Sequence, residues 1–178
     1  MIVVTGCVAC NGNPQQSAVQ QPDTATTPAR MTVTLPNEKP DSIQLEGGWQ
    51  PITLKLVKPA SSVPFVTYTP SDMIAESTGS GEGEAHYFYA NFAGRRNNDA
   101  FLLIFILPPG TAEEDAVRLA RAFKSSRQRP GFTVTTTLRR HGDRFYYLAE
   151  HYPGEYAEGF GPRSRKIQDE WQWLAPAP

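Results

Sequence analysis

Alternation of apolar and polar residues marks several short segments of the chain and predicts β-strands there. The segments with this pattern are residues 31–35, 52–57 and 86–93. Residues 63–70 form another short extended segment, whose prolines predict a position at the edge of a sheet. The segment Phe101–Leu107 differs from them because it is apolar at every position. Continuous apolarity predicts a central strand that is buried on both faces of its sheet.

A hairpin and two helices are predicted in the second half of the chain. Residues 132–139 and 144–152 flank a His-Gly-Asp turn, which favours two antiparallel strands. A first helix is expected from Thr111, which forms a capping-box pattern with Glu114. Its apolar stripe consists of Ala116, Leu119, Ala120 and Phe123. A second helix is expected to open at Gly161–Pro162, and its buried side should consist of Ile167, Trp171 and Leu174.

The order of these elements predicts the fold class. Hairpins rather than crossovers connect the strands, so the sheet should be mainly antiparallel. A doubly buried central strand also needs a covering layer on each face. We therefore expect an α+β domain in which helices flank an antiparallel sheet on both faces, an α/β/α sandwich. The prolines and glycines of residues 36–51 predict a long link, and the glycine-rich segment 76–84 predicts a loop.

Three segments between residues 65 and 174 fit this order of elements. They are "FVTYTPSDM" as the entry strand, "AFLLIFILP" as the buried strand, and "HYPGEYAEGF…IQDEWQWL" as the last strand and closing helix. With this element order and these segments, the chain resembles the PsbP-like family, which includes the lumenal extrinsic subunit of photosystem II and many bacterial envelope lipoproteins. The resemblance implies a PsbP-like sandwich and a mostly non-catalytic protein that binds partner proteins or metal ions.

Composition and charge exclude several classes of function. The chain has 178 residues, 39% hydrophobic residues and a formal net charge of -1, which is typical of one soluble domain. A net charge near zero gives no electrostatic basis for binding nucleic acid. No apolar run approaches the roughly 18 residues of a membrane-spanning helix.

The N-terminal residues determine the expected localisation. Val4-Thr5-Gly6-Cys7 resembles the lipobox of bacterial lipoproteins, so residues 1–7 are expected to be a signal remnant with Cys7 acylated. Residues 8–30 are polar and lack aromatic side chains, which predicts a disordered tether. Residues 31–178 would then form a single PsbP-like domain on the periplasmic or another extracytoplasmic face of the cell envelope. Few residues precede Cys7 for a signal peptide, so incidental cysteines and a redox or metal pair with Cys10 stay as alternatives.

Two groups of residues could carry metal or acid–base chemistry. Glu82, Glu84 and His86 alternate and would project from one face of an extended strand, where they could bind a divalent cation. Glu150, His151 and Glu155 lie where the last strand should leave the sheet, and a histidine beside carboxylates can act as a general base. The alternative function is therefore an envelope enzyme or metal-dependent module that uses one of these groups. A solvated loop edge and a structural histidine are the simpler interpretations of the same residues.

Aromatic and basic residues near the C-terminal half are the candidates for partner binding. Trp173 would lie about 200° from Trp171 around the second helix, so it either anchors a partner or folds back on the C-terminal tail. Arg121 and Lys124 could dock an acidic partner or lipid head groups, or simply keep one helix face solvated. We expect a non-catalytic, lipid-anchored, monomeric envelope protein without a cofactor. Its candidate partner-binding residues are Trp173, Tyr156, Arg121 and Lys124.

Overall fold

The computed structural model describes residues 34–175, and within this range the chain forms two antiparallel sheets, two α-helices and two short 3-10 helices. The strands are β1 (Glu38–Leu45), β2 (Gly48–Val57), β3 (Phe65–Pro70), β4 (Met73–Ser80), β5 (Gly83–Ala90), β6 (Asn97–Ile106), β7 (Phe132–His141), β8 (Arg144–Pro153) and β9 (Gln172–Trp173). The helices are α1 (Glu113–Arg127), α2 (Ala157–Asp169), η1 (Phe92–Gly94) and η2 (Gly154–Tyr156). The predicted lipobox with Cys7 and the predicted tether 8–30 lie outside the described residues.

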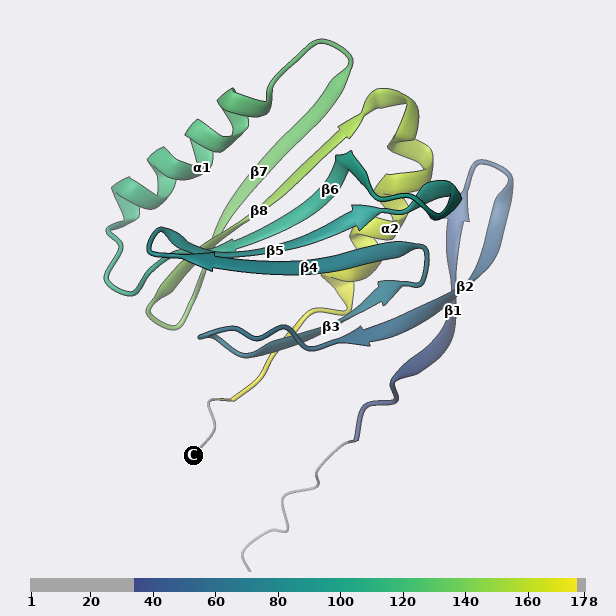
Figure 1. Ribbon diagram of the computed structural model, residues 1–178, viewed down its shortest axis with the longest axis horizontal. Coiled ribbons are helices and arrows are strands. Elements are labelled where there is room, and N and C mark those ends of the chain that lie inside the picture. Colours follow the sequence, from purple (N-terminus) through teal and green to yellow (C-terminus); the bar gives the residue numbers. More distant parts are fainter. Residues whose placement is uncertain (1–33, 176–178) are drawn as a thin grey trace, which may run out of the picture. The chain divides into compact units, whose positions relative to one another are not determined.

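The strands form a smaller and a larger sheet, and β6 is the central strand of the larger one. One sheet has the strand order β1-β2-β3-β9, and the other has the order β4-β5-β6-β8-β7 (Figure 1). Leu102 and Ile104 of β6 belong to one core cluster, whereas Phe101 and Leu103 belong to a second cluster. Successive residues of a strand point to opposite faces, so β6 supplies both cores.

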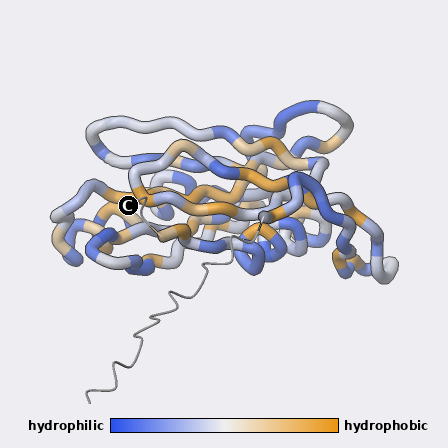
Figure 2. The backbone as a smooth tube through the Cα atoms, turned by 90° about the horizontal axis from the view of Figure 1, so that it is seen from below, coloured by the Kyte–Doolittle hydropathy of each residue, from blue (hydrophilic) through white to orange (hydrophobic). Residues whose placement is uncertain are grey.

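The two faces of the five-stranded sheet are covered differently. On one face α1 packs on β7 and β8 through its buried residues Ala116 and Ala120. On the other face α2 contacts β6 and β8, and it also contacts β1 and β3 of the smaller sheet (Figure 1). Phe160 and Ile167 of α2 are fully buried there. Figure 2 shows hydrophobic segments (orange) mainly along the strands in the middle of these layers.

The predicted α/β/α sandwich is wrong. Strands make up 51% of the structure and helices 23%, and α2 shares its face of the larger sheet with a second sheet. The second sheet exists because β1 and β2 pair as a hairpin where the prolines and glycines predict a link. β1 is an edge strand and carries Pro40, and Pro51 lies in the part of β2 that pairs with β1 alone. Prolines are tolerated at such positions because one side of the strand has no neighbouring strand, so the missing N–H of proline costs no inter-strand hydrogen bond.

The C-terminal helix also differs from its predicted extent. α2 begins at Ala157 and ends at Asp169, with Pro162 inside it. Residues 172 and 173 form β9, which pairs with the start of β3. An extended chain places Trp171 and Trp173 on the same side, whereas a helix would separate them. Both rings therefore pack against the core cluster that contains Phe65.

Residues 76–84 form a hairpin rather than the predicted loop. β4 and β5 pair as far as Ser80 and Gly83, on either side of a two-residue turn. Gly83 has a φ of 144°, and a Cβ atom there would lie 2.5 Å from the carbonyl oxygen of Ile106. Glycine is therefore needed for β5 to approach β6 this closely. The register of the hairpin places Ser77 opposite His86.

Candidate functional site

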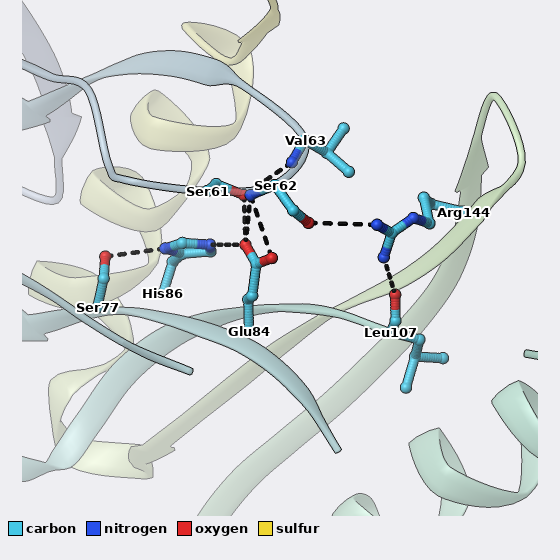
Figure 3. A network of polar contacts seen from close by, with 8 residues as sticks. All are labelled: Ser61, Ser62, Val63, Ser77, Glu84, His86, Leu107 and Arg144. Atoms are coloured by element: carbon cyan, nitrogen blue, oxygen red, sulfur yellow. Dashed lines mark hydrogen bonds and ion pairs between the residues drawn. The ribbon is translucent and has the colours of Figure 1, made fainter. Parts of the chain in front are cut away.

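His86 lies in β5 between a hydroxyl group and a carboxylate. The residue is 1% exposed, and its ring meets the ring of Phe65 edge-on at a centroid distance of 4.9 Å. Its Nδ1 atom lies 2.8 Å from the Oγ atom of Ser77 on β4. Its Nε2 atom lies 3.7 Å from the Oε2 atom of Glu84, which precedes it on the same face of β5 (Figure 3). The imidazole thus faces one potential nucleophile and one anion.

The loop between β2 and β3 fixes the Glu84 carboxylate. The Oε2 atom of Glu84 accepts a hydrogen bond from the Ser61 hydroxyl at 2.6 Å. The backbone N–H of Ser62 donates to both oxygens of the same carboxylate, at 3.0 and 3.1 Å. The Arg144 guanidinium donates to the carbonyl oxygen of Leu107 at 2.9 Å and to the Ser62 hydroxyl at 3.4 Å (Figure 3). A cavity of about 300 Å³ opens beside Ser62, Glu84 and Arg144.

The electrostatics of the pair favour a neutral imidazole beside an ionised carboxylate. Burial lowers the pKa of His86, and the nearby Glu84 carboxylate opposes this effect only in part. Burial alone would raise the pKa of Glu84, but the hydrogen bonds from Ser61 and Ser62 and the proximity of His86 lower it overall. A neutral imidazole carries one proton, and the carboxylate favours that proton on Nε2. The Nδ1 lone pair is then available to the Ser77 hydroxyl.

Glu82 does not join the other two predicted metal ligands. It lies exposed in the turn between β4 and β5 and lines a different cavity, of about 560 Å³, beside the start of α1. Among residues 34–175, no group of three His, Cys, Asp or Glu side chains is arranged to hold a metal ion. The structure therefore brings Glu84 and His86 together, but it separates Glu82 from them.

His151 lies on the other face of the five-stranded sheet, away from both carboxylates considered with it. Its ring is 2% exposed and stacks between Phe101 at 5.1 Å and Phe132 at 5.0 Å. Glu150 points to the opposite face, where it accepts a hydrogen bond of 2.5 Å from Ser164. Glu155 is exposed in η2. Burial and the nearby positive charges of Arg129 and Arg127 lower the pKa of His151, so it is a neutral core residue.

A second candidate site is a pocket of about 230 Å³ beside β9. We call it the aromatic pocket, and its lining residues are Arg139, Tyr146, Leu148, Gln168, Trp171 and Trp173. Trp171 stacks on Phe65 at a centroid distance of 3.9 Å, and Trp173 stacks on His141 at 4.4 Å. Neighbouring side chains therefore hold both indole rings in place. The alternative contact of Trp173 with the C-terminal tail involves residues outside the described range.

Two hydrogen-bond donors at the aromatic pocket lack partners within residues 34–175. The indole Nε1 atom of Trp171 is buried without an acceptor. Arg139 takes part in none of the ion pairs between described residues. Gln168, in contrast, donates to Glu150 at 3.2 Å and to Ser164 at 3.3 Å. Apolar rings beside an unpaired guanidinium favour an apolar group that has a carboxylate next to it.

The four predicted partner-binding residues do not form one surface. Trp173 contacts Tyr146 near the start of β8, whereas Tyr156 follows the end of β8 and contacts Phe92. Arg121 and Lys124 are exposed on α1, which covers the opposite face of the sheet. Of the four, Trp173 alone lines the aromatic pocket.

Sequence reasoning missed the serines and the arginine around Glu84 and His86. Ser77 could have been found, because a two-residue turn at Gly81-Glu82 would place it opposite His86 in a hairpin. Ser61, Ser62 and Arg144 carry no such local signal, since they reach Glu84 from a separate loop and from β8. Only tertiary contacts assemble this part of the site.

Comparisons with protein-family models, curated proteins and solved structures find no match to this chain. No helix within residues 34–175 has the length and hydropathy that a membrane span requires.

Proposed function

We propose that this protein is a lipid-anchored cell-envelope protein that acts by binding a partner protein. In this proposal Cys7 carries the lipid, and the aromatic pocket receives one side chain of the partner. The observation that supports the proposal most directly is an open pocket lined by two fixed tryptophan rings and by Arg139, which forms no ion pair with another residue of the range 34–175. Trp, Tyr and Arg are the residues that most often dominate the energy of protein interfaces.

The size of the aromatic pocket favours a protein side chain over a complete small ligand. Small-molecule sites usually enclose roughly 300–1,000 Å³, whereas this pocket has about 230 Å³. One large apolar side chain fits such a volume, and Arg139 would pair with a carboxylate beside it. The expected partner segment therefore combines a large apolar residue with an acidic residue or a chain terminus.

Photo-crosslinking in cells tests this proposal with the full-length chain. A benzoylphenylalanine at position 137 keeps Arg139 intact and lies on the same face of β7, opposite the pocket residue Leu148. It should give a discrete adduct with one envelope protein. The matched control is position 140, which lies on the same strand and points to the opposite face. Equal adducts from both positions, or none from position 137, would contradict binding at the pocket.

A binding measurement with the captured partner completes the test. Arg139→Glu should weaken the affinity at least tenfold, about 1.4 kcal/mol, because it replaces the cation at the pocket with an anion. Arg140→Glu carries the same charge change and should leave the affinity within about twofold, since its side chain lies on the other face. The lipid anchor is tested separately, by mass spectrometry of the N-terminal peptide and by membrane fractionation of Cys7→Ser.

A further inference from the structure

We infer that Ser77 is a nucleophile toward carboxylic esters, with His86 as its general base and Glu84 as the residue that positions the imidazole. This reactivity goes beyond partner binding, and it involves different side chains from those that line the aromatic pocket. The inference rests on the geometry of three groups in series: a hydroxyl, an imidazole and a fixed carboxylate (Figure 3).

The Ser77 hydroxyl is positioned to give up its proton and to meet an electrophile. Its Oγ atom lies 2.8 Å from the Nδ1 atom of His86, within the distance that proton transfer requires. Ser77 is exposed on β4, which is an edge strand of the larger sheet. A carbonyl group can therefore approach Oγ from solvent while the base stays buried beneath it.

Glu84 orients the imidazole and makes it a stronger base. Its carboxylate lies 3.7 Å from Nε2, and no other group among the described residues satisfies that buried atom. The carboxylate is itself held by Ser61 and Ser62. When Nδ1 takes up a proton, the resulting imidazolium faces an ionised carboxylate, which stabilises the charge that develops during attack. A purely structural hydrogen bond between Ser77 and His86 would require no such anion.

The reaction would proceed in two balanced steps. Oγ forms a bond to the ester carbonyl carbon while Nδ1 takes the hydroxyl proton, and the carbonyl π electrons move to oxygen. Collapse of this intermediate breaks the bond to the alkoxide, which leaves as the alcohol with the proton from Nδ1. Water then repeats the sequence on the acylated Ser77 and releases the carboxylic acid. The net reaction is ester plus water to acid plus alcohol.

A fluorophosphonate probe tests the nucleophile directly on the folded, full-length protein. Oγ should displace fluoride and form one phosphonylated residue, and peptide mass spectrometry should locate it at Ser77. Ser77→Ala should abolish the adduct. Ser80→Ala is the matched control, because Ser80 is an exposed serine on the same strand but the opposite face, and it should label like the parent protein. An adduct elsewhere, no adduct at millimolar probe, or equal labelling of denatured protein would overturn the inference.

The pH profile of labelling separates chemistry from structure. The rate should be constant near neutrality and fall only below pH 6.5, because the pKa of His86 lies below its ordinary value of 6.5. Glu84→Gln should slow labelling at least tenfold and move the midpoint to lower pH, since the carboxylate that raises the pKa of His86 is lost. A merely structural role for Glu84 would reduce the folded fraction but leave the labelling rate of the folded molecules unchanged. Hydrolysis of p-nitrophenyl acetate should follow the same variants in parallel.

Discussion

The two buried histidines lie on opposite faces of one sheet and differ in the groups that surround their rings. His86 is 1% exposed and His151 is 2% exposed, and burial lowers the pKa of both. His86 has a hydroxyl on one ring nitrogen and a carboxylate near the other. His151 lies between two phenylalanine rings and near positive charges. Burial makes an imidazole neutral, but its neighbours decide whether it can accept a proton from a nucleophile.

The largest difference between the two histidines should appear on unfolding. His86→Ala should lower the free energy of unfolding by about 3 kcal/mol, because it leaves a cavity and removes the partner of Ser77. His151→Leu should lower it by less than about 1.5 kcal/mol, because leucine fills an apolar site of similar volume. Urea unfolding of both variants measures the contrast. A loss in the His151→Leu variant as large as that in the His86→Ala variant would contradict the description of the His151 site as apolar.

An intermediate effect is expected at the carboxylate that distinguishes the two sites. Glu84→Ala should cost about 1–3 kcal/mol of unfolding free energy, because the Ser62 N–H and the Ser61 hydroxyl lose their acceptor. Glu84→Gln keeps an amide oxygen as an acceptor and should cost less than half as much. Chemical denaturation at pH 7 compares the two variants. A larger loss in the glutamine variant would mean that charge rather than hydrogen bonding holds the loop.

The smallest effects are pKa changes that should be confined to one histidine each. Glu84→Gln should lower the pKa of His86 further, because the carboxylate opposes the effect of burial. Arg129→Gln should raise the pKa of His151, because the positive charge of Arg129 lowers it. NMR titration of the ring protons follows both residues in one sample. A response of His86 to the Arg129 variant would show that the two sites are coupled through the sheet.

The same lowered pKa values set the direction of the pH dependence of stability. The ordinary histidine pKa is 6.5, and both folded values lie below it. As the pH falls through 6.5, the unfolded chain therefore binds protons before the folded chain does, and stability decreases. Glu84 adds to this loss at lower pH, because its folded pKa lies below the ordinary value of 4.5.

The sequence predicted Glu84, His86 and Trp173 as candidate site residues, but it missed Ser77 and Arg139. The alternation in β5 correctly places Glu84 and His86 on one face, because period-2 geometry is local. The same rule places Glu150 and His151 on opposite faces, because adjacent residues of a strand always point to opposite sides of the sheet. Glu82 was predicted to join Glu84, but a tight turn directs it elsewhere. Ser61 and Arg144 are distant in sequence and contribute only through the folded chain.

By itself the amino-acid sequence determined the buried central strand β6, the hairpin of β7 and β8, and the amphipathic helix α1, because each depends on local periodicity or turn residues. The tertiary structure decided that residues 38–57 form part of a second sheet and that the chain around Trp173 is a strand. In those segments the prolines predicted a link, and the helix-like spacing of Ile167, Trp171 and Leu174 predicted a helix. Pairing with β3 and stacking around Phe65 outweighed these weak local preferences, because cross-strand hydrogen bonds and aromatic burial act only between segments that folding brings together.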